Sequence, residues 1–424
     1  MSKMSKRHLI IKNVGPIKDI EIDLNKVNVF IGPQSSGKST IAKIISYCLW
    51  IEKTVCLFRP YLDIQTKFRQ KLEKYHHLHG YFKKESLIHY DSDFVTISYE
   101  KDCGIVTKKE PSPAQSPYDY LTYKRPKIVY APAERLLAAI RNWTSLKLPD
   151  DNLNSFLSEW GEMRGLFTEK RHLSVAPLGV EYHYDENSLK DYVATEEGTV
   201  ELTDASSGIQ SFTPLYLLHK VYNDYREELG KKSSFEDTVT FNNIYDRIRY
   251  NTTRLYPVEI PERDTFEYGN NKYYIVRPGM KEKAIAILDN YTKIQYVQSI
   301  IEEPELNLFP SAQQEMVYEF LTDTVNSENT LTLTTHSPYI LFAINNCMMG
   351  GIVGQHIPTE KREQFPSHHA WISPNLVSIY EIHDGQLKCI QDEDGIIEDN
   401  YLNQAYKENS SEYLSLLNYY EDGE

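Results

Sequence analysis

The sequence predicts an α/β fold in which helices pack on a mixed sheet. Three observations predict it. An alternating strand over Val27–Ile31 leads into a glycine-rich loop and then a helix. An apolar strand over Tyr296–Ile301 is followed by paired carboxylates, and an alternating strand over Leu331–Thr335 ends at a histidine. Strands that carry such loops and alternate with helices are typical of a nucleotide-binding α/β domain.

The first forty residues contain three expected strands and the start of a helix. The strands are His8–Lys12, a second over Ile20, Ile22 and Leu24, and Val27–Ile31, with a turn at Val14-Gly15-Pro16. The helix that follows carries apolar residues at 3.6-residue spacing, namely Ile41, Ile44, Ile45, Cys48 and Leu49. We expect this helix to pack on the sheet.

The loop between the third strand and this helix fits the phosphate-binding pattern GxxxxGK[ST]. It consists of Gly32, Pro33, Gln34, Ser35, Ser36, Gly37, Lys38, Ser39 and Thr40. In such a P-loop the backbone N–H groups and a helix N-terminus converge on the phosphates. We expect Lys38 to reach the β and γ phosphates and Ser39 to supply a hydroxyl to Mg²⁺. The sequence therefore predicts that the chain binds a nucleoside triphosphate.

The second motif is the carboxylate pair Glu302-Glu303, which begins the run EEPELNLFP. A buried strand that ends in two carboxylates places the first near Mg²⁺ and lets the second orient and deprotonate the attacking water. This is a Walker B arrangement. The alternative is an ordinary acidic loop after a strand.

The third motif is His336, at the end of the strand Leu331–Thr335. A histidine at the end of a neighbouring strand can reach the γ phosphate, although a lone histidine there is more often structural. His336 follows Glu303 by 33 residues, which leaves room for one helix and one strand. This order favours a role in the nucleotide site.

The fourth motif is a turn of small residues before an expected helix over Phe212–Val221. Its candidate binding residues are Ser206, Ser207, Gly208 and Gln210. Backbone donors and a serine hydroxyl at a helix N-terminus form an anion site. An ordinary N-cap is the alternative.

Length and composition exclude several classes of protein. The 424 residues suffice for one large α/β domain with an insertion, or for two or three smaller domains. No run approaches the roughly 18 apolar residues that span a membrane, and the N-terminus lacks a secretory signal, so we expect a cytoplasmic protein. The five cysteines are scattered without ligand spacing, which argues against disulfides and structural zinc.

The net charge of −14 argues against a surface built to hold nucleic acid. One segment, Lys67–Lys84, is basic and carries Phe68, Leu72 and Tyr75 at helical spacing. It indicates an amphipathic helix with a solvated basic face, and a contact to a phosphate backbone or partner is the alternative.

Other segments are assigned from periodicity and turn residues. We expect mainly helix over 52–87, strands that pair around a turn near Gly104, a proline-containing linker at Glu110–Tyr118, a strand at Lys127–Tyr130 followed by a helix, helix over 145–175 and strands over 178–203. Residues Ile379–Ile390 indicate a hairpin that turns at Asp384-Gly385, and Tyr413–Glu424 a surface helix and tail.

The motifs in combination resemble the ABC-type ATPase heads of the RecF, Rad50 and OLD group. The resemblance rests on FIGPQSSGKST, SSGIQ, IEEPELNLFP and TTHSPYI, and it covers roughly residues 1–50, 200–215 and 295–345. The stand-alone ATPases of two-gene anti-phage systems, of the PARIS and Septu types, are the most similar. No heptads are sustained long enough for the coiled-coil arms of SMC-type relatives.

The resemblance implies a role for each motif residue. Lys38, Glu303 and His336 would be catalytic, with Glu303 the general base and His336 a switch histidine, and Ser39 and Glu302 would hold Mg²⁺. Ser206 and Gly208 would be signature residues that close on the ATP of another subunit, so a homodimer or higher oligomer is implied. Arg135 falls where similar proteins place an arginine near the nucleotide.

The resemblance also divides the chain. The ABC-type core would comprise 1–50, 87–135, 178–221 and 291–424, with helical insertions at 51–86 and 136–177. Because Gly208 and Glu302 are 94 residues apart, where many ABC enzymes need only a few tens, we expect an inserted subdomain within 222–290.

OLD proteins join such a head to a Toprim nuclease, which needs an Asp-x-Asp pair at strand ends. The similar run toward the C-terminus is Asp392-Glu393-Asp394, with too little chain behind it to complete such a domain. His368 and His369 lack the partners of an HNH site. We therefore expect a separate effector, a Toprim or HNH nuclease, which the ATPase switches in anti-phage defence after a DNA or phage-protein trigger.

Two alternatives remain open. One is a DNA-repair ATPase that clamps DNA as RecF and Rad50 do, which salt-sensitive DNA binding would favour. The other is an OLD-like nuclease with a cryptic C-terminal site, which metal-dependent DNA cleavage would favour. The acidic charge argues against the first and the short C-terminus against the second.

Overall fold

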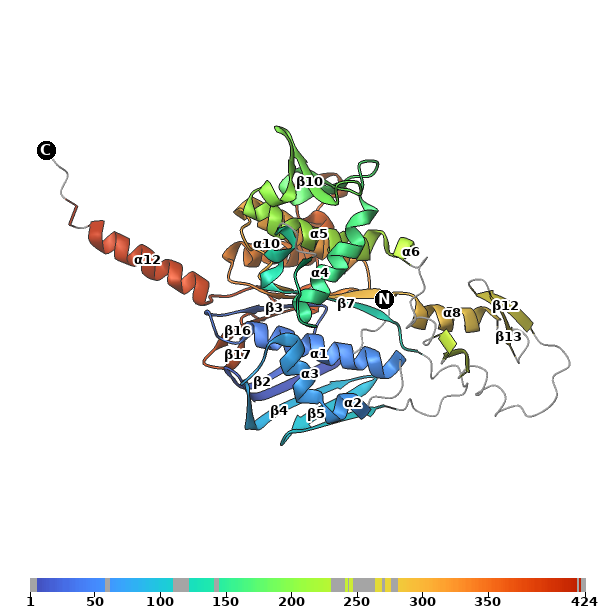
Figure 1. Cartoon of the computed structure of the whole chain (residues 1–424). Coiled ribbons are helices and arrows are strands. Elements are labelled where there is room, and N and C mark those ends of the chain that lie inside the picture. The colour runs from blue at the N-terminus through green and yellow to red at the C-terminus, as the bar shows by residue number, and fades with distance from the viewer. Residues whose placement is uncertain are drawn as a thin grey trace.

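The computed structural model confirms the α/β fold class and the mixed sheet. It describes residues 6–57, 62–109, 122–140, 145–229, 241–242, 244–246, 264–268, 271–275, 281–417 and 419–420. The body is an eleven-stranded sheet with helices on both sides (Figure 1). No described helix is both long and apolar enough to cross a membrane.

The large sheet has the strand order β6-β5-β4-β1-β2-β17-β16-β3-β15-β14-β7. These strands are β1 (Arg7–Val14), β2 (Ile17–Asp23), β3 (Val27–Ile31), β4 (Phe82–Ser92), β5 (Val95–Glu100), β6 (Cys103–Lys108), β7 (Pro126–Ala131), β14 (Tyr296–Glu302), β15 (Thr330–Thr334), β16 (Val377–His383) and β17 (Gln386–Cys389). From β16 to β7 neighbouring strands are parallel, so their carboxyl ends meet at one edge. From β6 to β2 they are antiparallel.

Helix α1 (Lys38–Leu57) lies between the parallel and the antiparallel halves of this sheet (Figure 1). Its apolar residues join one of the two hydrophobic clusters. A buried ion pair fixes it further, because Arg7 of β1 donates to Glu52 at 3.1 Å. The short helices α2 (Leu62–Thr66) and α3 (Phe68–His76) follow it. The expected basic, amphipathic helix is therefore confirmed for α3.

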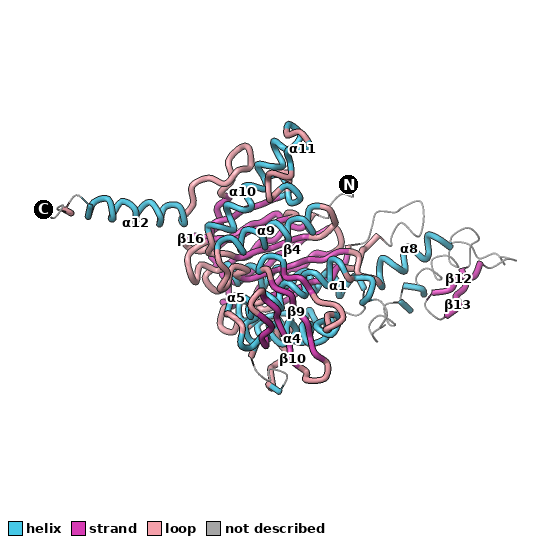
Figure 2. The backbone as a smooth tube through the Cα atoms, turned by 90° about the horizontal axis from the view of Figure 1, so that it is seen from above, coloured by secondary structure: helices cyan, strands magenta, loops and turns pink. Residues whose placement is uncertain are grey.

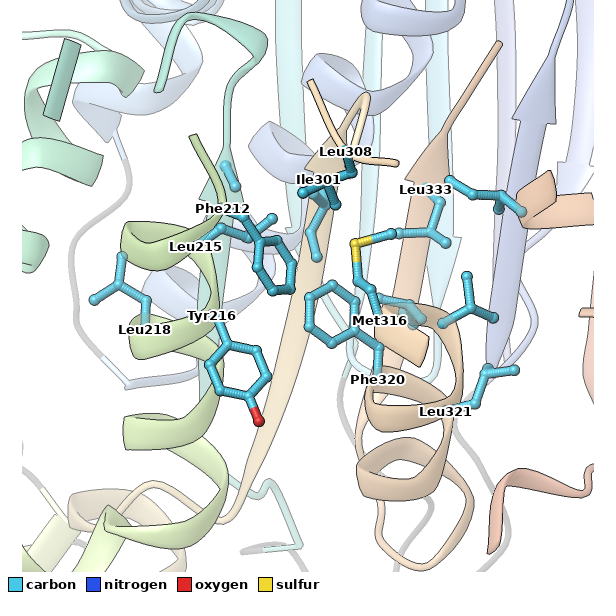
Figure 3. Close-up of a cluster of buried hydrophobic side chains, with 14 of the residues drawn as sticks. Phe212, Leu215, Tyr216, Leu218, Ile301, Leu308, Met316, Phe320, Leu321 and Leu333 are labelled. Atoms are coloured by element: carbon cyan, nitrogen blue, oxygen red, sulfur yellow. The ribbon is translucent and has the colours of Figure 1, made fainter. Parts of the chain in front are cut away.

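Helices α5 (Ser207–Asp224), α9 (Pro310–Val325) and α10 (Pro338–Val353) cover the other face of the parallel strands. Figure 3 shows Phe212 of α5 and Phe320 of α9 facing each other, and their ring centroids are 6.4 Å apart. Ile301 of β14 and Leu333 of β15 lie beside them in the same cluster. This packing holds α5 beside the strand that ends in the paired glutamates.

A separate four-stranded sheet has the order β11-β10-β9-β8. Its strands are β8 (Leu173–Val175), β9 (Val180–Asp185), β10 (Lys190–Thr195) and β11 (Gly198–Glu201). The remaining elements are α4 (Asn152–Met163), α6 (Arg226–Leu229), the hairpin β12 (Asp264–Tyr268) and β13 (Asn271–Ile275), α8 (Lys281–Thr292), α11 (Thr359–Arg362) and α12 (Tyr401–Leu417). Figure 1 and Figure 2 both show α12 projecting from the body.

Several sequence assignments differ from the structure. The helical stretch expected over 52–87 ends at His76, and β4 begins at Phe82. In contrast, the strands expected to pair around a turn near Gly104 are confirmed, with the turn at Lys101-Asp102, whose φ angles are 52° and 59°. The helix expected after Tyr130 is a 3-10 helix over Ala133–Ala139. The linker Glu110–Tyr118 and most of the subdomain expected at 222–290 lie outside the described residues.

Candidate nucleotide-binding site

The P-loop lies where β3 turns into α1. Gly32 has a φ of 150°, and a Cβ there would lie 2.6 Å from the carbonyl oxygen of Ile382, so glycine is required. The amine of Lys38 donates to the carbonyl oxygens of Gly32 at 2.9 Å and Pro33 at 3.0 Å. Pro33, Gln34 and Ser35 are exposed, Ser36 and Ser39 are half-buried, and Gly37, Lys38 and Thr40 are buried. The lysine is thus held inside the loop.

The electrostatics of Lys38 suit a group that meets phosphate. Burial lowers the pKa of Lys38 to about 8, and the carboxylates of Glu303, Glu305 and Glu302 oppose this shift. A phosphate anion beside the amine would act in the same direction as these carboxylates and favour the charged form. The lysine is therefore placed to gain interaction energy when an anion binds.

Glu302 ends β14 and points toward the start of α1. It is 4% exposed, and its carboxylate accepts hydrogen bonds from the hydroxyls of Tyr130 and Ser39. Burial raises the pKa of Glu302, while the charge of Lys43 and the Ser39 hydrogen bond oppose the shift. A hydroxyl and a carboxylate side by side are the oxygen donors that Mg²⁺ accepts. Ser39 and Glu302 therefore fit a magnesium ion by their donor chemistry.

Glu303 points elsewhere because its backbone leaves the strand conformation. Its φ is 44°, in the left-handed region that costs a residue other than glycine of order 1–3 kcal/mol. Its N–H still donates to the carbonyl oxygen of Thr334 at 2.9 Å, which holds this turn. As a result the Glu303 side chain is 31% exposed, and its Oε1 lies 3.8 Å from Nε2 of His336. The side chains of these adjacent glutamates thus lie in different places: that of Glu302 faces Ser39 and that of Glu303 faces His336.

His336 follows β15 and is oriented through Glu305. One carboxylate oxygen of Glu305 accepts two hydrogen bonds, one from the backbone N–H of His336 at 2.7 Å and one from the Thr335 hydroxyl at 2.8 Å. Burial lowers the pKa of His336, the charge of Lys38 acts in the same direction, and Glu303 opposes them. The neutral imidazole is therefore favoured.

The side chain of Arg135 contacts the backbone of the paired glutamates, and its expected contact with the nucleotide stays a prediction. Its side chain is fully buried, and burial lowers the pKa of Arg135 to about 10. Its guanidinium donates to four carbonyl oxygens, those of Glu302 and Glu303 at 2.7 Å each, Pro132 at 3.2 Å and Ser211 at 3.3 Å. Arg135 therefore fixes the backbone of the paired glutamates and ties it to α5.

Replacing Arg135 with alanine is expected to lower the free energy of unfolding by at least about 3 kcal/mol, because buried carbonyls lose a charged donor. Arg135→Lys should recover only part of this loss, since an ammonium cannot span the four acceptors. Arg171→Ala is the control, because the side chain of Arg171 is 39% exposed and its carboxylate partner Glu228 also lies at the surface, so the loss there should be clearly smaller. Urea unfolding measures the stability of all three variants. An Arg135→Ala variant as stable as the parent would refute the role of Arg135 in holding the glutamate backbone.

The expected signature turn lies at the N-terminus of α5. Ser206 and Ser207 are exposed, and the Ser206 hydroxyl makes no capping hydrogen bond to the described first turn. A Cβ on Gly208 would lie 2.7 Å from the carbonyl oxygen of Asn307. Gln210 instead faces its own loop, donating to the carbonyl oxygens of Thr203 and Ala205 at 2.9 Å each. The turn thus presents free hydroxyls and a positive helix end to the outside.

Sequence reasoning missed three residues of this site. Tyr130, whose hydroxyl donates to Glu302, lies near the end of β7 beside β14, and its position could have been found only from the strand order. Glu305 lies in the EEPE run and was visible as a carboxylate. Tyr401 has a hydroxyl 3.4 Å from Nδ1 of His336, and no pattern in the sequence connects it to the motifs.

The acidic run near the C-terminus has a structural role in its own loop. Asp392 accepts a hydrogen bond from the N–H of Ile396 at 2.8 Å. Asp392, Glu393, Asp394 and Glu398 line an open pocket of about 600 Å³ with Gln391. Among the residues that the structure describes, no group of three His, Cys, Asp or Glu side chains is arranged to hold a metal ion.

Comparisons with known proteins agree with this geometry. The AAA ATPase domain family matches residues 4–97, less than a quarter of the chain, which include the P-loop. No curated protein matches. The P-loop geometry and this match indicate an ATPase, and no wider family membership follows from a match of that length.

Similar solved structures include the SMC head domain from Thermotoga maritima (10% identity, 92% of this chain and 99% of that one, TM-score 0.36). Another is the recombination mediator RecF with ATPγS (10%, 92% and 99%, 0.32), and a third is a nucleotide-free ATP-binding cassette from an ABC transporter (12%, 91% and 89%, 0.25). These TM-scores lie below 0.5, so the likenesses do not assign the chain to a family.

Proposed function

We propose that the chain is an ATP-dependent switch, in which two copies close around ATP and Mg²⁺ and separate after hydrolysis. The observation that carries this proposal is the convergence of Lys38, Glu302, Glu303 and His336 at one edge of the sheet. ATP turnover by the purified chain tests it, with the expectation of activity that chelation of divalent metal abolishes. A chain that binds no ATP would contradict it.

The side chains divide the chemistry of hydrolysis among them. Lys38 exchanges its carbonyl partners for the β and γ phosphates of ATP. Ser39 and Glu302 would hold Mg²⁺, and the bound ion would neutralise phosphate charge. Glu303 orients and deprotonates the attacking water. Its carboxylate can take this role because it is partly exposed and makes no buried ion pair among the described residues. His336 donates from Nε2 to the γ phosphate. Arg135 holds the backbone of Glu302 and Glu303 in place through their carbonyl oxygens.

The exposed signature turn supports closure between two copies. Ser206 and Ser207 are exposed, and the N-terminus of α5 carries a positive partial charge that favours an anion. The phosphates of the same chain are bound by the P-loop at the start of another helix. A second copy that places its ATP against Ser206 and Gly208 would complete the site.

Gly208→Ala is expected to reduce ATP turnover at least about tenfold while ATP binding by the single chain is retained. The new methyl group would meet the Asn307 carbonyl oxygen at 2.7 Å, so α5 must shift away from the loop that follows the glutamates. Gly165→Ala is the matched control, because nothing lies within 4 Å of its Cβ position. Turnover assays measure ATP hydrolysis, and nucleotide titration measures ATP binding by the single chain. Normal turnover by the Gly208 variant would remove the signature assignment.

The proposed output of the switch is control of a separate effector, a nuclease of the Toprim or HNH type, in anti-phage defence. This part rests on the resemblance of the four motifs to stand-alone defence ATPases. Co-purification with the product of the adjacent gene, with and without ATP, tests it. Equal failure to bind in both nucleotide conditions would contradict the effector assignment and leave the ATPase proposal intact.

A further inference from the structure

Tyr401 joins the nucleotide site to the projecting helix α12. It is the first residue of this helix, and its hydroxyl lies 3.4 Å from Nδ1 of His336. Burial raises the pKa of Tyr401 to about 12, and a hydrogen bond with the backbone of Gly32 opposes this shift. One hydroxyl therefore touches both the first residue of the P-loop and the histidine.

The position of Tyr401 is fixed from several sides. Its N–H donates to the Glu381 carboxylate of β16 at 3.0 Å. The side chain of the buried Asn400 accepts from the N–H of Leu402 at 3.1 Å. Tyr401 and Leu402 pack against the hydrophobic cluster beneath α10. The tyrosine is thus anchored to the body, although the helix that it begins projects away from it (Figure 2).

The contact with Tyr401 lies at the Nδ1 side of His336, and the phenol O–H can donate to this nitrogen. A neutral imidazole that accepts at Nδ1 carries its proton on Nε2. Nε2 is the nitrogen that faces Glu303, at 3.8 Å. A histidine held in this way presents an N–H donor toward the place where the proposed function puts the γ phosphate.

We propose that Tyr401 is a positioning residue for ATP hydrolysis: it holds His336 in the tautomer that donates from Nε2, and it connects this histidine to the first turn of α12. The proposal rests on the proposed function of His336. Because the same residue begins α12, engagement of His336 by ATP changes the hydrogen bond that anchors the helix.

Tyr401→Phe tests the proposal by removing one oxygen atom. The expected result is a fall of kcat by about five- to tenfold, the worth of one hydrogen bond, with an unchanged KM for ATP. Tyr406→Phe is the matched control, since Tyr406 lies on the same helix with 74% of its surface exposed. This control should turn over ATP at the parent rate.

A double-variant comparison separates positioning from a general structural effect. If Tyr401 acts through His336, then Tyr401→Phe adds no further loss of kcat to His336→Ala. A further loss in the double variant would overturn the proposal. If His336→Ala alone leaves turnover unchanged, the proposed function of His336 fails, whereas a slow His336→Ala beside a normal Tyr401→Phe refutes only the role of Tyr401.

Two measurements remain informative whatever the turnover of these variants. In protein labelled with ¹⁵N-histidine, the signal absent from His336→Ala should show a protonated Nε2 in the parent and a mixture of tautomers in Tyr401→Phe. Hydrogen exchange over 401–417 should change when ATP binds to the parent and not to Tyr401→Phe. Identical tautomers of His336 in the parent and in Tyr401→Phe would overturn the positioning role. Hydrogen exchange over 401–417 that does not change when ATP binds to the parent would overturn the link to α12.

Discussion

Glu303→Gln is expected to slow ATP turnover by roughly 10²–10⁴-fold while ATP binding is retained. The amide preserves the size of the side chain and cannot accept the proton of the attacking water. Its backbone is held by Thr334 and Arg135 independently of the side chain, so the turn should survive. Steady-state turnover and equilibrium ATP binding, measured on the same preparation, give the two halves of this result.

Glu315→Gln is the matched control for this prediction. Glu315 is an exposed residue of α9, the helix that follows the paired glutamates, and it belongs to no motif. The same loss of one negative charge there should leave turnover unchanged. Turnover at the parent rate by Glu303→Gln would show that another group is the base.

Lys38→Ala is expected to weaken ATP binding by roughly 10²-fold and thereby to abolish turnover at ordinary ATP concentrations. The amine is the charged donor inside the loop, and each hydrogen bond to a charged group is worth about 1.5–3 kcal/mol. Calorimetric titration with ATP measures the affinity directly.

The fold of the Lys38 variant needs its own check, because the Gly32 and Pro33 carbonyl oxygens lose their donor. Thermal unfolding compares it with the parent. Lys18→Ala, an exposed lysine of β2, is the control for the loss of a positive charge. Unchanged ATP affinity in a folded Lys38 variant would contradict the assignment of the P-loop.

The elements around the motifs could be predicted because their patterns are local. The strand expected at Val27–Ile31 and the helix that carries Ile41 and Ile44 are both confirmed, since alternation and 3.6-residue spacing fix which face is buried. The hairpin at Asp384-Gly385 is confirmed for the same reason. The roles of the individual motif residues stay predictions until the variants are measured.

What could not be predicted depends on contacts between distant residues. Arg135 was expected at the nucleotide, and strand order places its guanidinium against the backbone of the paired glutamates, where it donates four hydrogen bonds to carbonyl oxygens. Tyr401 meets His336 across 65 residues without any local signal. Over 51–86 the helical expectation extended too far, because the basic segment before Phe82 continues into β4, whose pairing with β1 is a tertiary effect.

The molar mass of Glu303→Gln in solution, measured by light scattering with and without MgATP, tests the central claim most directly. The variant should bind ATP without consuming it and therefore accumulate in the closed assembly. The expected result is a mass that at least doubles when MgATP is added, and no such change in Lys38→Ala. A mass that stays the same in saturating MgATP, with binding verified in the same sample, would contradict an ATP-driven switch between two copies of the chain.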